Sequence, residues 1–214
     1  MSLYRTLALA AIASSVFAVG CTTSPTAHFY TLSPVQVGEP TPALKPIAIA
    51  IGPVTVPDLV DCPQIVSTID ANRVSIDEFA RWADPLKSQV GRAFAQDLTQ
   101  LIRGSVVSVY PQRASGSSYA VSVDVQSFDS PIDGGAVTLA VIWSVRPSKG
   151  NAIDGRSVVR EAVRGAGYDA LVNAHSRALA SVANDIAAAI LIRRNVDPAC
   201  PMINSWCAGH DHGA

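Results

Sequence analysis

Residues 84–104, with the sequence DPLKSQVGRAFAQDLTQLIRG, decide the fold class because they predict a long amphipathic helix. Their apolar side chains recur every three or four residues, and this spacing places them on one side of a helix. Asp84 before Pro85 is a favoured helix start, and Gly104 is a common helix end. Polar side chains lie largely off the apolar stripe, namely Gln89, Arg92, Gln96 and Asp97. We therefore expect one face of this helix on a core and the other face in water.

Alternating residue patterns on both sides of this helix predict β-strands. The expected strands are residues 29–32, 47–51, 54–57, 65–69, 73–76, 106–110, 118–128, 136–145 and 156–164. The prolines of residues 33–46 predict a loop that cannot join the middle of a sheet. Residues 136–145 are apolar almost throughout, which predicts a central strand covered on both sides.

A second long helix is predicted over residues 169–193. Its apolar positions fall on one face, namely Leu171, Ala178, Val182, Ile186 and Ile190. Arg193 and Arg194 suit the negative end of the helix dipole. Together these elements predict an α+β fold, in which an antiparallel or mixed β-sheet has two long helices packed on one face.

The first twenty residues have the features of an export signal. Arg5 is followed by an uncharged apolar run from Leu7 to Val19, shorter than the roughly 20 residues that a membrane-spanning helix needs. The small residues before Cys21 resemble the lipobox of bacterial lipoproteins, in which this cysteine is acylated with fatty acids such as palmitate. An ordinary cleaved signal with an incidental cysteine is the alternative. We expect residues 1–20 to be removed and Cys21 to be the lipidated first residue.

The position after the lipidated cysteine bears on the membrane that holds the protein. Thr22 stands where aspartate favours retention in the inner membrane of enterobacteria, so the analogy points to the outer membrane, with the inner membrane less favoured. We expect residues 21–27 to form a lipidated tether in the periplasm. Residues 28–196 then form the folded domain, and residues 197–214 form a C-terminal tail.

Charge and composition exclude some classes of partner. The chain has 16 basic and 17 acidic residues, so it has no basic excess for binding nucleic acid. Charged residues make up only 15% of the chain, which indicates extensive burial, including burial against other subunits. No segment after the signal is long and apolar enough to predict a transmembrane helix.

The remaining cysteines suit an oxidising compartment. Cys200 and Cys207 could close a short disulfide loop in the tail, or the tail could be disordered; the sequence leaves this open. His210 and His212 add two potential zinc ligands, but the cysteine spacing differs from that of usual zinc sites, so we expect no metal site. Cys62 is expected to be a small buried residue or a free thiol.

Recognisable catalytic and cofactor-binding motifs are missing from the sequence. His175 lies beside the apolar stripe of the second helix and is expected to be a partly buried structural residue. Asp58 and Asp61 lie in a loop bounded by prolines, where a turn is expected rather than an acid/base pair. The sequence therefore predicts no catalytic residue, no cofactor and no enzyme.

Several motifs in a fixed order carry a resemblance to a known family. They are HFYTLSP at residues 28–34, IGPVTVP at 51–57, PQIV at 63–66, NRV at 72–74 and EFARWADPL at 78–86. These motifs resemble those of the ABC-type transport auxiliary lipoproteins, the PqiC family. The resemblance covers about residues 28–102, and the later strand and helix pattern is compatible with it.

The resemblance implies a non-catalytic lipoprotein subunit of an ABC transport system that moves lipids between the inner and outer membranes and supports envelope integrity. The implied partners are a periplasm-spanning protein with MCE domains, its ABC permease and ATPase, and further copies of the chain in a homo-oligomeric ring. A periplasmic lipid-binding carrier, with an apolar cavity for phospholipid between sheet and helices, is the alternative.

Four residues are candidates for docking a partner, namely Pro53, Pro57, Phe79 and Trp82. The two prolines suit a rigid loop that docks a partner, although they also suit a loop that only joins strands. The two aromatic residues would be interface anchors if exposed, and a hydrophobic plug at the helix entrance if buried.

Overall fold

The computed structural model describes residues 25–35, 41–112, 116 and 118–196 of the chain. Its elements in chain order are β1 (His28–Tyr30), β2 (Thr41–Thr55), β3 (Gln64–Asp70), β4 (Arg73–Trp82), α2 (Leu86–Leu101), β5 (Ile102–Val109), β6 (Tyr119–Asp129), β7 (Ala136–Pro147), β8 (Ile153–Ala162) and α3 (Gly167–Val196). The predicted α+β class is confirmed, with two mixed sheets rather than one.

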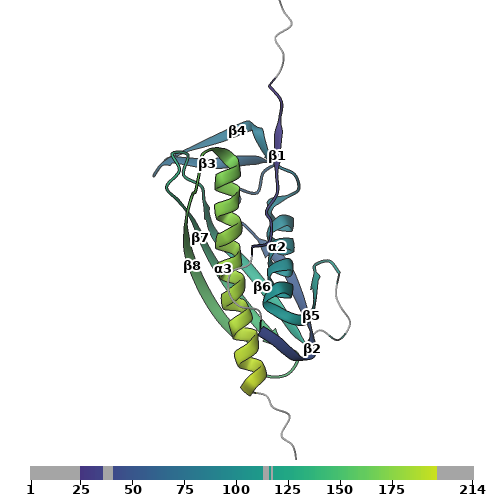
Figure 1. Cartoon of the computed structure of the whole chain (residues 1–214). Coiled ribbons are helices and arrows are strands. Elements are labelled where there is room, and N and C mark those ends of the chain that lie inside the picture. Colours follow the sequence, from purple (N-terminus) through teal and green to yellow (C-terminus); the bar gives the residue numbers. More distant parts are fainter. Residues whose placement is uncertain (1–24, 36–40, 113–115, 117, 197–214) are drawn as a thin grey trace, which may run out of the picture.

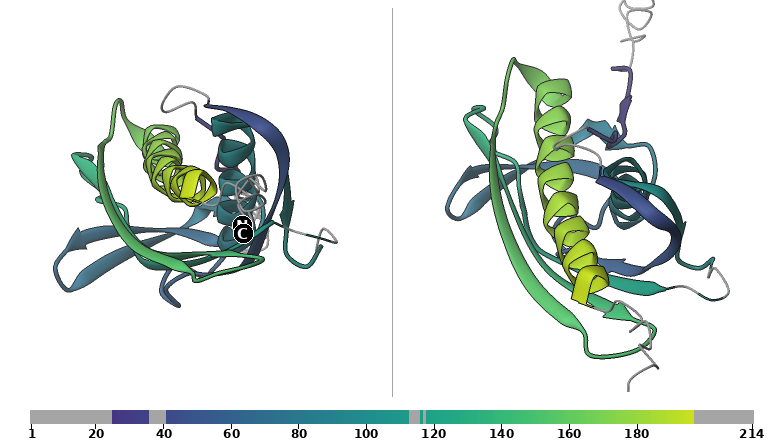
Figure 2. Two further views of the ribbon diagram at one scale, coloured as in Figure 1. Left: turned by 90° about the horizontal axis from the view of Figure 1, so that it is seen from below. Right: turned by 60° about the horizontal axis from the view of Figure 1, so that its bottom comes forward.

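The larger sheet has the strand order β5-β2-β6-β7-β8. Its first three strands run parallel, and β7 and β8 continue it antiparallel. Figures 1 and 2 show this sheet curving around α2 and α3, which lie side by side on one of its faces. The other face of the sheet carries no helix among the described residues.

Side-chain alternation explains why the helices cover only one face. The residues of β6 that face the helices are large and buried, as Val121, Val123 and Val125 show. On β7, Leu139 and Val141 are fully buried on the same side, whereas Ile142 is 44% exposed on the other. The expectation that residues 136–145 are covered on both sides is therefore wrong, because both helices pack on the same face.

A glycine makes room for the largest side chain under α3. Trp143 of β7 and Gly155 of β8 are direct cross-strand partners. A Cβ atom at Gly155 would lie only 2.2 Å from the indole ring of Trp143. The indole Nε1–H donates to Ser157 Oγ at 3.0 Å, and Ser157 donates to Asp185 on α3 at 2.6 Å. The missing side chain at residue 155 thus lets Trp143 lie across the neighbouring strand.

The smaller sheet, in the order β1-β4-β3, sits at one end of the molecule (Figure 1). A column of rings holds it there: Trp82 contacts Phe128 edge-on, and Phe128 stacks on His175 of α3 at a centroid distance of 3.7 Å. Tyr30 of β1 also contacts Tyr168 at the start of α3. The predicted turn at residues 70–72 joins β3 to β4 as an antiparallel hairpin, and β4 continues further than expected, to Trp82.

Three sequence predictions for the termini of these elements are wrong. Helix α2 begins at Leu86 with Pro85 as the N-cap residue and no side-chain cap, while the Asp84 carboxylate pairs with Arg92. The helix ends at Leu101 and leads directly into β5, so Gly104 lies within a strand instead of ending the helix. Strand β2 starts at Thr41, inside the predicted loop 33–46, because its early residues pair only with β5.

The chain that leaves β1, residues 31–35, has no strand partner among the described residues, and we call it the strap. Its backbone N–H groups are instead bonded by side chains of the two helices. Leu32 donates to Gln89 Oε1 at 2.8 Å, Ser33 to Ser176 Oγ at 3.2 Å, and Val35 to Asp97 Oδ1 at 3.1 Å. These contacts fix the chain that leads out of β1 to the helix layer.

Candidate functional site

The uncovered face of the five-stranded sheet has a floor of small side chains. Those that line its central hollow are Ala50 and Gly52 of β2, Ala120 and Ser122 of β6, and Ser144 of β7. The strand register places Ala50 beside Ala120 and Ser122 beside Ser144, so the floor is continuous across three strands. Small side chains leave the backbone of this face open to another surface.

A bulge in β2 shapes one wall of this hollow. The pairing of β2 with β6 shifts between Ile51 and Val54, where Gly52 and Pro53 interrupt the strand. Gly52 lies close to β6, since a Cβ atom there would be 3.4 Å from the carbonyl oxygen of Val121. Proline has no N–H to donate, so the ladder is broken at Pro53 and its ring is exposed.

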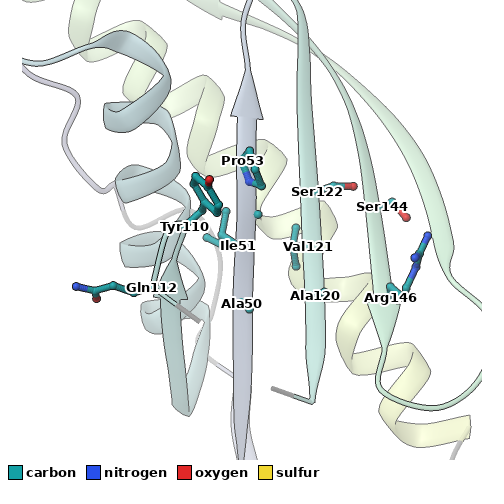
Figure 3. Close-up of a pocket in the computed structure, with 11 residues that line it drawn as sticks. Ala50, Ile51, Pro53, Tyr110, Gln112, Ala120, Val121, Ser122, Ser144 and Arg146 are labelled. Carbon is teal, nitrogen blue, oxygen red and sulfur yellow. The ribbon is translucent and has the colours of Figure 1, made fainter. Parts of the chain in front are cut away.

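The hollow is a groove of about 440 Å³ with an aromatic wall and a cationic wall (Figure 3). Tyr110 lies next to Pro53 on one side and is 53% exposed. Its backbone N–H donates to the carbonyl oxygen of Ile51 at 2.9 Å, which ties the chain after β5 to β2. Arg146 lies on the opposite side and has no ion-pair partner among the described residues. This arrangement suits an apolar segment that carries an anionic group near Arg146.

The four candidate docking residues are divided between the surface and the core. Pro53 lines the groove, and Pro57 is half-buried in a smaller hollow of about 200 Å³ near the three-stranded sheet. Phe79 is 42% exposed on β4. Trp82 is only 5% exposed and packs on Phe128. Of the two alternatives for this residue, a buried hydrophobic plug and an exposed interface anchor, the structure has the buried plug.

His175 and Ser130 form a buried hydrogen-bonded pair. His175 Nε2 lies 2.8 Å from Ser130 Oγ, and no partner is described for Nδ1. The imidazole is fully buried, deeper than the partly buried position expected from the sequence. Burial lowers the pKa of His175 to about 3, so the ring is neutral at physiological pH. A residue with no exposed atom cannot touch a substrate, and its ring stacking serves the attachment of the smaller sheet.

Asp97 is a second buried polar group, and it holds the strap. Its Oδ1 accepts the Val35 N–H, whereas no partner is described for Oδ2. Burial raises the pKa of Asp97 to about 7, and the Val35 hydrogen bond opposes this shift. Gln89 and Asp97 were expected on the water-facing side of α2, but both are buried. The amino-acid pattern carries no signal for this burial, because only the folded chain shows that the strap covers that side of α2.

Asp58 and Asp61 lie in the turn that follows β2, as expected. The N–H groups of Val60 and Asp61 donate to the carbonyl oxygen of Pro57, and Asp61 pairs with Lys87 at 3.1 Å. Cys62 is a half-buried free thiol. The described residues contain no cluster of His, Cys, Asp and Glu that could hold a metal ion. Cys21, Cys200, Cys207, His210 and His212 lie outside the described residues.

Among the described residues, no helix combines the length and the apolar composition needed to cross a bilayer.

Comparisons with solved structures identify the fold. A crystal structure of an uncharacterised protein matches with a TM-score of 0.66 and 22% identity, covering 78% of this chain and 99% of the other. The crystal structure of a DUF330-family protein from Xanthomonas campestris matches with a TM-score of 0.63 and 16% identity, covering 79% of this chain and 99% of the other. A search of the curated proteins gave no match.

The family assignment rests on the sequence. The model of the ABC-type transport auxiliary lipoprotein component matches residues 30–187, a range that runs from the end of β1 into α3. This range contains both sheets except for the first residues of β1, and it contains the whole groove. The chain therefore belongs to the family of ABC-type transport auxiliary lipoprotein components.

Proposed function

We propose that this protein is a non-catalytic subunit of an ABC-type system that moves lipids between the inner and outer membranes. Acylated Cys21 holds it to the outer membrane, facing the periplasm, where copies of the chain form a ring on an MCE-domain protein. The family match over residues 30–187 is the observation that carries the proposal. The export signal and Cys21 support the anchor, and Thr22 favours the outer membrane.

A non-catalytic role agrees with the chemistry of the described residues. The pair with the distances of a nucleophile and a base, Ser130 and His175, is enclosed in the core. The groove is lined by small, apolar and hydroxyl side chains with one carboxamide, that of Gln112, and one guanidinium, and its lining contains neither a carboxylate nor an imidazole. Such a surface suits recognition better than acid–base chemistry.

The groove is the surface that we assign to the MCE-domain partner. Its rims are rigid, because Pro53 restricts the backbone and the Tyr110 N–H is bonded to β2. Its floor of small side chains lets a partner approach the sheet closely, and aromatic residues such as Tyr110 are common anchors in interfaces. A partner segment with apolar residues and a carboxylate would complement Tyr110 and Arg146.

Purification of the tagged full-length protein from cross-linked, solubilised membranes tests the proposal. We expect an MCE-domain protein and its permease in the eluate, and we expect Ala120→Leu, which fills the groove floor, to reduce their recovery at least fivefold. Asn184→Leu on the exposed side of α3 is the control for added bulk and should recover them normally. An eluate without any MCE-domain protein, from cells that express one, would contradict the assignment.

A lipid-binding carrier is the second candidate, and the groove is the observation that favours it. Its apolar lining could accept an acyl chain while Arg146 pairs with a phosphate. The sequence-based expectation placed such a site between sheet and helices, where the side chains of the core pack instead. Phospholipid extracted in stoichiometric amount from purified wild-type protein, but not from the Ala120→Leu variant, would favour the carrier.

A further inference from the structure

The outer face of the three-stranded sheet carries exposed apolar side chains from two strands. One face of β3 carries every second side chain, namely Gln64, Val66 and Thr68. Their cross-strand partners on β4 lie on the same face and are, in the same order, Arg81, Ile76 and Val74. Arg81 is also the partner of Phe29 on β1, and Phe79 lies two residues before Arg81. We call Phe29, Val74, Ile76 and Phe79 the apolar face.

The side chains of the apolar face are exposed to solvent, whereas Val66 on the same side of β3 is buried. Phe29, Val74, Ile76 and Phe79 are 66%, 39%, 51% and 42% exposed. The opposite face of the same sheet is covered, since the Tyr168 hydroxyl at the start of α3 hydrogen-bonds with Ser67 and Asp77 there. Leu59, which is 57% exposed, extends the apolar face across the hollow that it lines with Val66 and Val74. A cluster of large exposed apolar side chains marks a contact surface.

The position of Cys21 in the chain indicates which partner the apolar face contacts. Phe29 lies eight residues after Cys21, so a fully extended chain separates them by at most about 28 Å. Helix α3 starts beside β1 and runs for 30 residues, about 45 Å, toward the other end of the molecule (Figure 1). A lipid on Cys21 therefore holds the three-stranded sheet near the bilayer and the far end of α3 away from it.

We infer that the apolar face rests on the lipid surface that anchors the chain, with Phe29, Ile76 and Phe79 entering the interface. This inference rests on the proposed anchor and adds the orientation of the domain. The charges around the face balance and do not favour attraction to anionic headgroups: Asp70 is paired with Arg73, and the negative charge of Glu78 offsets the positive charge of Arg81 beside Phe29. The contact is therefore apolar, and salt should change it little.

Fluorescence quenching of the full-length lipidated protein in vesicles of phosphatidylethanolamine and phosphatidylglycerol with brominated acyl chains tests the contact. The matched variants are Ile76→Trp on the apolar face and Val158→Trp on the uncovered face of the five-stranded sheet, both at exposed aliphatic residues of strands. Both variants keep the native tryptophans, so the difference in quenching between them comes from the added tryptophan. We expect bromine to quench the added emission of Ile76→Trp at least threefold more, in low and in high salt.

The outcomes separate the contact from the anchor. Lipidation is measured independently from the mass of the N-terminal peptide. If the protein is lipidated and quenching is equally weak in both variants, the contact is overturned and the anchor is kept. If the protein carries no lipid and the tryptophan at residue 76 is still quenched, the contact is kept and the anchor is overturned. Emission at residue 76 that changes with protein concentration in detergent, without quenching in vesicles, assigns the face to a second copy and overturns the inference. Phe79→Trp repeats the measurement if Ile76→Trp fails to fold.

Discussion

The two faces of the five-stranded sheet differ in what their side chains do. Toward the helices, each strand presents large apolar residues such as Ile49, Val121 and Leu139, all nearly inaccessible to solvent. On the opposite face, the same strands present Ala50, Ala120 and other small residues that floor a groove. The covered face stabilises the fold, and the uncovered face leaves room for another molecule. Neighbouring residues of one strand should therefore respond to mutation in opposite ways.

The largest effect is expected on the covered face. Leu139→Ala removes a fully buried side chain from the centre of the core and should lower the free energy of unfolding by about 3 kcal/mol. Ile142→Ala on the uncovered face of the same strand should cost less than about 1 kcal/mol, since that side chain is 44% exposed. Urea unfolding of both variants measures the difference, and equal losses would show that the two faces are packed alike.

A pH effect on stability should come from the covered side as well. The pKa of His175 is about 3 in the folded chain and near 6.5 when unfolded, so the unfolded state binds the proton first on acidification. The contribution of His175 to the free energy of unfolding is complete above pH 6.5. It is lost as the pH falls toward 3, by at most about 1.4 kcal/mol per pH unit.

The variant His175→Gln isolates this group from the carboxylates that also titrate in acid. Its stability should fall less than that of the wild type between pH 6.5 and 4.5, by up to about 2.7 kcal/mol over the two units. Parallel curves for the two proteins would mean that the imidazole is accessible to protons in the folded state.

A third effect should come from the cross-strand pair beneath α3. Gly155→Ala places a methyl group in the space of the Trp143 ring and should destabilise the fold by about 2 kcal/mol. The double variant Gly155→Ala with Trp143→Leu should recover part of this loss, because the smaller side chain leaves room for the methyl group. Thermal or urea unfolding of the single and double variants tests this, and a stable single variant would show that the indole can move aside.

The smallest change in stability is expected on the groove floor. Ala120→Leu should alter the free energy of unfolding by no more than about 0.5 kcal/mol, although it fills the groove beside Ser122. Its neighbour Val121→Ala should cost about 2 kcal/mol, because Val121 is buried, and it keeps the small side chains of Ala120 and Ser122 on the groove floor. Urea unfolding measures both changes, and a strongly destabilised Ala120→Leu variant would show that residue 120 faces the core.

The sequence could predict the elements that are defined by periodic burial. The stripe from Leu171 to Ile190 and the alternation from Tyr119 to Val125 identified α3 and β6, because burial on one side leaves a period in the chain. The covering of β7 on both sides was wrongly predicted, since an apolar run does not reveal how many faces are packed. The split into two sheets likewise depends on long-range pairing between β1 and β4.

The candidate site could be predicted only in part. Pro53 was singled out as a rigid element, and it lies on the rim of the groove. Tyr110 and Arg146 were missed, because strands far apart in the sequence bring them to opposite walls (Figure 3). Gln89, Asp97 and Ser176 were missed for a related reason: each is a polar helix residue whose partner is a backbone N–H of the strap.

Cross-linking from single positions in cells tests most directly whether the uncovered face is the docking surface. A photoreactive phenylalanine derivative in place of Tyr110, on the groove wall, should cross-link to an MCE-domain protein, whereas the same residue at Asn184, exposed on α3, should not. The Ala50→Leu variant, which fills the floor from β2, should abolish the cross-link from position 110. Cross-links of equal yield from both positions, or from Asn184 alone, would contradict the assignment of docking to the uncovered face.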